Sequence, residues 1–158
     1  MRRKAKGFTL IELIVVIAII GILAAMLVPS MLAYAKNARI TQYNSNARSV
    51  YEGAQLGITD VIIAQGTVLP DTVYICSAEG SGVCVADGSA DRCDITDYIG
   101  EDFAGYFGFM TDSGGTGCVY AMWSNSPLTA AELGTQMTSG DVKSSFDTVP
   151  IGCHPLDE

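Results

Sequence analysis

The feature that most constrains this chain is an apolar segment near its N-terminus, residues 8–28, FTLIELIVVIAIIGILAAMLV. A helix over this segment rises about 1.5 Å per residue and is about 30 Å long, the thickness of a bilayer's hydrocarbon core. The preceding Arg2, Arg3, Lys4 and Lys6 keep the N-terminus in the cytoplasm and direct the rest outward. A secretory signal peptide fits poorly, because its apolar core is only about 7–15 residues long and ends in an Ala-x-Ala-like site. The segment therefore predicts a membrane-spanning helix, with a plain signal anchor as the alternative.

One charged residue, Glu12, lies inside this apolar segment, which contains no basic residue. A carboxylate at membrane depth is costly, so it needs a partner or access to the interface. Snorkelling of the side chain toward the interface is one explanation. The other is a contact between molecules, because cleavage after Gly7 would create a charged amine on Phe8. The amine of a neighbouring copy would then neutralise Glu12.

The segment from Lys6 to Met31, KGFTLIELIVVIAIIGILAAMLVPSM, resembles the N-terminus of type IV prepilins and the related pseudopilins. The likeness is carried by a short basic leader that ends in Gly7, by the FTLIE sequence after it, and by Gly21 and Pro29. These motifs are specific, but they cover only the N-terminal part of the chain.

In that family a membrane aspartyl peptidase cuts after the glycine and methylates the new terminal residue. The resemblance therefore implies Gly7 as the cleavage site, Phe8 as the N-methylated terminus and Glu12 as the acid that registers each incoming subunit. Gly21 and Pro29 would let the helix loosen during assembly, or are ordinary residues of a membrane helix. The implied partners are other copies of the chain, a prepilin peptidase, a membrane assembly platform and, indirectly, an assembly ATPase. The chain itself has no P-loop.

Beyond Pro29 a helical period continues to about Gln65, followed by stop signals at Gly66 and Pro70. Proline removes one helical hydrogen bond, so a local kink is expected there. Two glycines, Gly53 and Gly57, weaken the prediction for the second half. The apolar stripe consists of Ile40, Ala47, Val50, Tyr51, Ala54, Ile58, Val61 and Ile62.

After Gly66 the composition changes to Gly, Ser, Thr and Asp with short apolar runs. Strands are predicted over residues 72–77, 82–86, 103–110 and 117–123, the last two as an antiparallel hairpin around the turn-rich residues 111–116. Residues 124–145 read as loops with one short helix over 129–133, and residues 149–151 as an edge segment.

These elements predict an α+β fold in which a long N-terminal helix packs on a small antiparallel sheet with disulfide-bearing loops. The first half of the helix spans the membrane and the second half is amphipathic. The expected organisation is a basic leader over residues 1–7 that is removed, a transmembrane and assembly helix over 8–28, and an exported domain over 29–158.

Five cysteines, Cys76, Cys84, Cys93, Cys118 and Cys153, follow the membrane segment. None has the spacing of a zinc site, so disulfides in an exported domain are predicted. An odd number allows at most two bridges within one chain. The pairing stays open, and one thiol either remains buried or pairs with another molecule.

The charge is asymmetric, because removal of residues 1–7 leaves five basic residues against seventeen acidic ones. The excess of acidic residues in the remaining chain argues against binding to duplex nucleic acid. It includes the stretch 87–102, where Asp87, Ser89 and Asp91 form a weak calcium candidate. Tyr98 stands where a calcium loop of the EF-hand type needs a bidentate glutamate, and a solvated acidic loop is the simpler reading. No metal and no cofactor is predicted.

Two other groups of residues are candidates for a sugar-binding site and a catalytic site. Trp123 with Tyr98, Tyr106 and Tyr120 would form a platform for stacking sugars, although aromatic residues in a hairpin are more often core. His154, the one histidine, would need Cys153 as a thiolate to act catalytically, and an exposed tail histidine beside a disulfide is the expected alternative.

The predicted function is a structural subunit of a type IV pilus or related filament, and not an enzyme. The subunit would be a single-pass precursor in the cytoplasmic membrane and later part of a surface filament. The alternatives are a pseudopilin of a secretion or DNA-uptake system, and a pilin-anchored adhesin that binds polysaccharide.

Overall fold

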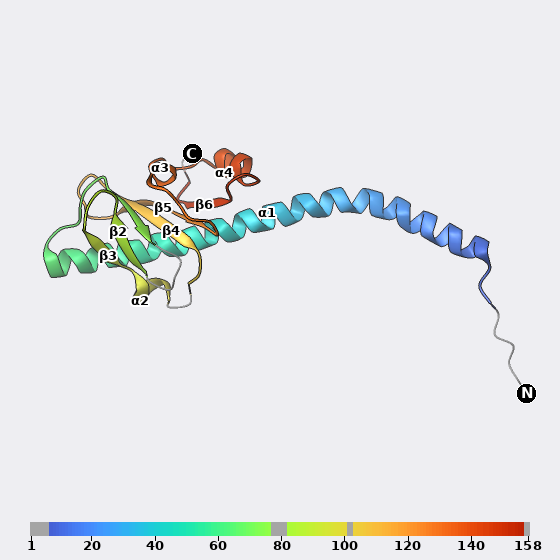
Figure 1. Cartoon of the computed structure of the whole chain (residues 1–158), viewed down its shortest axis with the longest axis horizontal. Coiled ribbons are helices and arrows are strands. Elements are labelled where there is room, and N and C mark those ends of the chain that lie inside the picture. Colours follow the sequence, from blue (N-terminus) through green and yellow to red (C-terminus); the bar gives the residue numbers. More distant parts are fainter. Residues whose placement is uncertain (1–6, 77–81, 101–102, 157–158) are drawn as a thin grey trace, which may run out of the picture. The chain divides into compact units, whose positions relative to one another are not determined.

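A computed structural model describes residues 7–76, 82–100 and 103–156 of the chain (Figure 1). It divides into two compact units, residues 1–38 and 39–158. The helices are α1 (Leu10–Gln65), α2 (Thr96–Ile99), α3 (Ala130–Leu133) and α4 (Ser139–Ser145). The strands are β1 (Val73–Cys76), β2 (Val83–Ala86), β3 (Arg92–Asp94), β4 (Tyr106–Thr111), β5 (Cys118–Ser124) and β6 (Ile151–His154).

The helix α1 ends at Gln65, as the sequence predicts, and Gly66 follows with a positive φ of 91°. Its helical assignment continues through both Gly21 and Pro29. Next to the proline, the Ser30 hydroxyl donates to the carbonyl of Leu27 at 2.8 Å. The kink predicted at Pro29 stays a prediction.

The six strands form one antiparallel sheet in the order β3-β2-β1-β4-β5-β6. The predicted hairpin is β4–β5, in which Phe107 lies opposite Trp123. The four predicted strands and the helix at α3 are confirmed, and Thr129 caps α3. The prediction at Ser77 lies outside the described residues. An edge strand, β6, is present near the predicted edge segment, but it shares only Ile151 with residues 149–151 and runs on to His154.

Three elements were not predicted: β3, α2 and α4. The strand β3 and the helix α2 lie within the stretch read as an acidic loop. The helix α4 lies in the region read as loops. Its N-terminus has a capping box, in which Thr138 accepts from the amide of Asp141 and the Asp141 carboxylate accepts from Thr138. Reciprocal bonds of this kind satisfy the free amides of a first turn.

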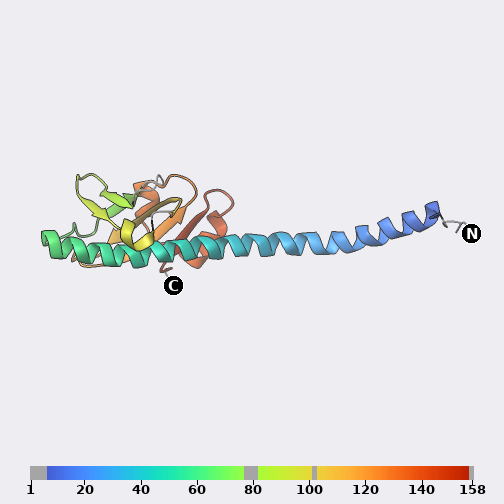
Figure 2. The ribbon, with the colours of Figure 1, turned by 90° about the horizontal axis from the view of Figure 1, so that it is seen from below.

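The second half of α1 lies along one face of the sheet (Figure 2). Its buried residues are Ile40, Tyr43, Ala47, Val50, Gly53, Ala54, Gly57 and Ile58. The stripe predicted from the sequence is therefore largely confirmed, while Tyr51, Val61 and Ile62 are half-buried at its edges. The helix continues through the two glycines, which permit close packing, because a Cβ on Gly57 would lie 2.6 Å from Cγ2 of Ile95.

Polar bonds also join α1 to the sheet. The Gln55 amide donates to the carbonyl of Cys118 at 2.9 Å, and the amide of Cys153 donates to Oδ1 of Asn44 at 3.2 Å. The opposite face of the sheet meets α3, where the Tyr120 hydroxyl donates to the carbonyl of Leu133 at 2.6 Å. The unit 39–158 is thus a sheet covered on both faces, with its own buried core.

Candidate functional site

The first turn of α1 brings Thr9 and Glu12 together in a capping box. The amide and the hydroxyl of Thr9 donate to Oε2 of Glu12 at 2.8 and 2.6 Å, and the amide of Glu12 donates to the Thr9 hydroxyl at 3.3 Å. This reciprocal arrangement fixes the carboxylate at the start of the helix. Within the described residues both side-chain bonds end on the same oxygen, so Oε1 can accept from a donor on another molecule.

Sequence reasoning treated Thr9 only as part of the resemblance and missed this role. The signal was present, because a threonine followed three residues later by a glutamate, directly before an apolar run, is typical of a helix N-terminus. Part of the cost of Glu12 is therefore offset within the chain itself, since its carboxylate satisfies a backbone amide that has no partner in the helix.

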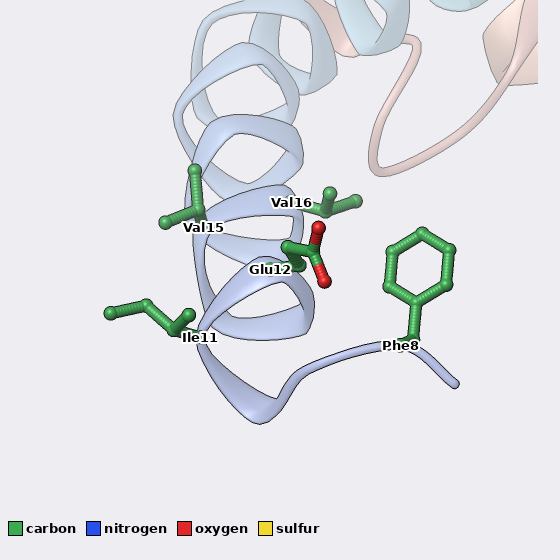
Figure 3. Close-up of a pocket in the computed structure, with 5 residues that line it drawn as sticks. All are labelled: Phe8, Ile11, Glu12, Val15 and Val16. Atoms are coloured by element: carbon green, nitrogen blue, oxygen red, sulfur yellow. The ribbon is translucent and has the colours of Figure 1, made fainter. Parts of the chain in front are cut away.

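Glu12 is surrounded on the helix surface by apolar side chains, and together with Phe8, Ile11, Val15 and Val16 it lines a shallow, open apolar groove. Figure 3 shows the carboxylate pointing to the side of the helix where the Phe8 ring and Val16 lie, while Ile11 and Val15 point the other way. One acidic group is thus presented beside an aromatic ring and branched aliphatic side chains. Such a groove suits a partner that is itself apolar and carries one positive charge.

The apolar side chains around this groove have no cover within the chain. Every described side chain from residue 7 to residue 35 is exposed, including Phe8 at 83% and Met26 at 72%. The segment is long and apolar enough to cross a membrane. Exposed apolar surface of this extent requires lipid or other helices as a cover.

The comparisons with known proteins concern this same segment. Residues 2–28 match the family described as prokaryotic N-terminal methylation motif. The chain carries an N-terminal methylation motif. This motif contains Gly7, Phe8, Glu12 and Gly21, whereas Pro29 lies one residue beyond it.

Named relatives match over part of the chain. The type IV wide pilus major component PilA4 of Thermus thermophilus is 53% identical over 57 residues, which cover 34% of this chain and 44% of the relative. The type IV major pilin protein PilE of Neisseria gonorrhoeae is 36% identical over 83 residues, 52% of this chain and 47% of the relative. The type II secretion system core protein G of Pseudomonas aeruginosa is 41% identical over 49 residues, 31% of this chain and 34% of the relative.

These matches confirm the resemblance to type IV pilins and pseudopilins that the first residues predicted. The chain spans less than half the length of each of these three relatives. No solved structure matches the chain. The likeness therefore concerns the N-terminal helix most directly, and the sheet is described from its own geometry.

The cysteines divide into one disulfide and three buried thiols. Cys76 on β1 is bonded to Cys84 on β2, and Cys93, Cys118 and Cys153 are free. Burial raises the pKa of the Cys93 and Cys153 thiols to about 11, and it raises the pKa of Cys118 as well. The three thiols are therefore protonated near neutral pH and are weak nucleophiles.

His154 is not the exposed tail histidine that the sequence suggested. It lies in β6, half-buried, with its ring 5.4 Å from that of Tyr51 on α1. The adjacent Cys153 is a free thiol and is not in a disulfide. Burial raises its pKa, so the thiol is protonated near neutral pH. A nucleophilic Cys–His pair needs the thiolate, so these two residues do not form a catalytic site.

The calcium candidates lie at the turn between β2 and β3. The amide of Asp91 donates to the Ser89 hydroxyl at 3.2 Å, and the amide of Ala86 donates to the carbonyl of Asp91 at 2.9 Å. These bonds close a hairpin around Asp87. In the part of the chain that the structure describes, no group of three or more histidine, cysteine or acidic residues is placed to hold a metal ion.

The alternative of a sugar-stacking aromatic platform is contradicted, and the reading of the hairpin aromatics as core holds for Trp123 and Tyr120. Trp123 and Tyr120 are buried, with 5% and 3% of their surface exposed. They point to opposite faces of the sheet: Trp123 packs edge-on against Tyr43 of α1, with ring centroids 4.6 Å apart, whereas Tyr120 bonds to α3. Tyr98 is on α2 and its hydroxyl donates to Asp60. Tyr106 on β4 is half-buried, whereas Trp123 and Tyr120 are core residues and cannot stack on a sugar.

Proposed function

We propose that this chain is a subunit of a type IV pilus or a related filament, processed after Gly7 and polymerised through its N-terminal helix. The main support for this proposal is the apolar first half of α1, which is exposed along its length and holds a single fixed carboxylate at its start. The unit 39–158 has its own core, so the apolar segment is not needed to complete that core. Such a division suits an anchor that changes its surroundings from lipid to other helices.

During assembly, the apolar half of α1 would exchange its contacts with lipid for contacts with the helices of other subunits. Helices already in a bilayer gain little hydrophobic energy by associating, so close packing and polar contacts must select the partner. We propose that the free amine of Phe8 in one subunit pairs with Glu12 of its neighbour. The attraction is strong in a medium of low dielectric, although desolvation of both charges offsets part of it. The pair therefore sets register more than it adds affinity.

The methylation motif supports the proposed processing, and the proposed partners are those that such processing and assembly would need. Cleavage after Gly7 removes the four basic residues of the leader and creates the amine that Glu12 requires. The partners of this account are a prepilin peptidase, a membrane assembly platform, an assembly ATPase acting indirectly, and other copies of the chain. The subunit itself acts structurally and not as an enzyme. The precursor would lie in the cytoplasmic membrane with residues 39–158 outside.

The test uses variants of Glu12 in the native host. Glu12→Gln keeps a side chain that can serve in the capping box and removes only the charge. We expect intact processing, an unchanged amount of subunit in the membrane, and at least a tenfold loss of filament from the sheared surface fraction. Immunoblotting of both fractions and electron microscopy of the cells measure this.

The matched control is Thr9→Ala, which removes the hydroxyl of the capping box and retains the charge. We expect filament in amounts near those of the wild type, because the contact between molecules needs the carboxylate and not the hydroxyl. Abundant filament from Glu12→Gln would contradict the registry role. Equal loss in both variants would assign the defect to the helix start.

A pseudopilin is the second candidate, and the likeness to the type II secretion system core protein G favours it. A pseudopilin would undergo the same processing but would remain in the cell envelope. Recovery of the processed chain only from membranes, with no subunit in the sheared fraction, would support this reading. The adhesin alternative has lost its proposed sugar site, since Trp123 is buried.

A further inference from the structure

Three of the five cysteines lie side by side on three adjacent strands. Cys76 on β1 is directly opposite Cys84 on β2, and Cys84 is directly opposite Cys93 on β3. Residues directly opposite each other in antiparallel strands point to the same face. All three side chains are buried, with no more than 1% of their surface exposed. The sheet therefore holds a row of three sulfur atoms, of which the middle one belongs to Cys84.

The backbone register makes both neighbours of Cys84 competent to bond to it. The Cα atoms of Cys76 and Cys84 are 4.1 Å apart. On the other side, Ile95 donates to Gly82 and Ala86 donates to Asp91, both at 2.9 Å. Hydrogen-bonded pairs recur at every second residue, so Cys84 and Cys93 form such a pair, with Cα atoms about 5.5 Å apart. Most disulfides have Cα atoms about 4.4–6.8 Å apart, so the expected Cys84–Cys93 spacing permits a bond.

We infer that Cys93 exchanges with the Cys76–Cys84 disulfide, so that the protein holds either a β1–β2 or a β2–β3 covalent link. The Cys93 thiolate attacks Sγ of Cys84 from β3, the strand on the other side of β2 from Cys76. The Cys84–Cys93 bond forms as the Cys76–Cys84 bond breaks. The electron pair of the broken bond leaves on Cys76, which takes up the proton that Cys93 has lost. The number of thiols and disulfides is unchanged, so no oxidant or reductant is needed.

The surroundings of the three cysteines make the exchange slow and confine it to cysteines of the same chain. Burial, together with the nearby Asp94 carboxylate, raises the pKa of Cys93 to about 11, so its thiolate is scarce near neutral pH. Against this, a thiol held beside its target acts at a high effective concentration. External thiols cannot reach the row, because the sheet and α1 cover it. A Cβ on Gly57 of α1 would lie only 3.5 Å from Sγ of Cys93.

The two disulfide isomers differ in which strands they link covalently. The strand β3 is at the edge of the sheet, and among the described strands it pairs only with β2. The observed link joins β1 to β2 and leaves β3 held by backbone bonds. The exchanged link would tie this edge strand covalently to β2, and with it the adjoining helix α2, whose Tyr98 hydroxyl bonds to Asp60 of α1. Exchange therefore changes how firmly the edge beside the end of α1 is fixed.

Trypsin distinguishes the isomers without reduction. No lysine or arginine lies between Arg48 and Arg92 or between Arg92 and Lys143. Cys76 and Cys84 thus fall in one peptide, residues 49–92, and Cys93 and Cys118 in the next, residues 93–143. The full chain in detergent is incubated at about pH 9, denatured, blocked with N-ethylmaleimide at mildly acidic pH, digested and analysed by mass spectrometry. We expect the joined pair of peptides to increase with time to a constant fraction.

Three variants decide the assignment. Cys93→Ser should give no joined pair, and Cys118→Ser should give the wild-type fraction. Cys76→Ser, refolded from denaturant in the presence of oxidised and reduced glutathione, should form the Cys84–Cys93 bond in most molecules. The inference is overturned if the wild-type chain gives no joined pair at any time, or if the pair survives in Cys93→Ser. It is equally overturned if Cys84 and Cys93 are both alkylated in the oxidised Cys76→Ser chain.

Discussion

The closest contact between α1 and the sheet provides a quantitative prediction. Gly152 of β6 is buried against the backbone of Tyr43, and a Cβ placed on it would lie 2.2 Å from both the carbonyl carbon and the carbonyl oxygen of Tyr43. Those are backbone atoms of a helix, which cannot rotate away as a flexible side chain can. Gly152→Ala therefore forces α1 and β6 apart by about 1 Å to reach ordinary contact.

The cost can be worked from the contacts that this separation disturbs. Overpacking a buried site typically costs about 1–3 kcal/mol. The bond from the amide of Cys153 to Asn44, at 3.2 Å, would lengthen and lose about 1 kcal/mol more. We therefore expect a loss of about 2–4 kcal/mol in the free energy of unfolding. In a unit of this size that corresponds to a fall in Tm of roughly 8–16 °C.

The assay follows the fluorescence of Trp123, the only tryptophan, during thermal unfolding of the full chain in detergent. Trp123 is directly opposite Gly152 and packs against Tyr43, so it reports on the disturbed contact. Gly140→Ala is the control, because a Cβ there meets only the Thr138 hydroxyl at 3.5 Å and alanine favours the helix α4. Its Tm should be unchanged or higher. A Tm for Gly152→Ala within about 2 °C of the wild type would refute the close-packing argument.

Two further predictions concern buried polar groups. Thr111 is fully buried, donates to the carbonyl of Leu69 at 2.7 Å and accepts from the amide of Thr72 at 3.0 Å, so Thr111→Val should lower the free energy of unfolding by about 1–3 kcal/mol. Urea denaturation measures this, and equal stability of Thr111→Val and Thr111→Ser would contradict it. Burial, aided by Arg48, lowers the pKa of His154, so its NMR titration should have a midpoint below 6.5. As the pH falls, the histidine of the unfolded chain is protonated before that of the folded chain, so the free energy of unfolding should decrease below about pH 6.5. If His154→Gln left this pH dependence unchanged, His154 would be excluded as its cause.

Elements with strong local patterns were predictable from the sequence. The helix end at Gln65 followed from the apolar period and from Gly66, and the β4–β5 hairpin followed from two apolar runs around a glycine-rich turn. The strand β3 was not predictable in this way, because it is three residues long and two of them, Arg92 and Asp94, are charged. Its pairing with β2 decides its conformation, and that pairing is not visible in a short window.

The same distinction separates the predicted and unpredicted parts of the sites. Glu12 was found because a carboxylate in an apolar run conflicts with its surroundings, whereas Thr9 was overlooked as an ordinary polar residue. The burial of Trp123 depends on Tyr43, which lies 80 positions earlier in the sequence and packs against it only in the folded unit. The pairing of Cys76 with Cys84 required the strand register, since spacing alone left every pairing open.

The proposed function depends on processing at Gly7 and assembly into a filament. Mass spectrometry of the N-terminal tryptic peptide from a sheared extracellular fraction examines both steps together. We expect a peptide that begins at Phe8 and carries one added methyl group on its amine. A chain that reaches the surface with its leader, residues 1–7, still attached would overturn the proposal, because Glu12 would then have no Phe8 amine to pair with.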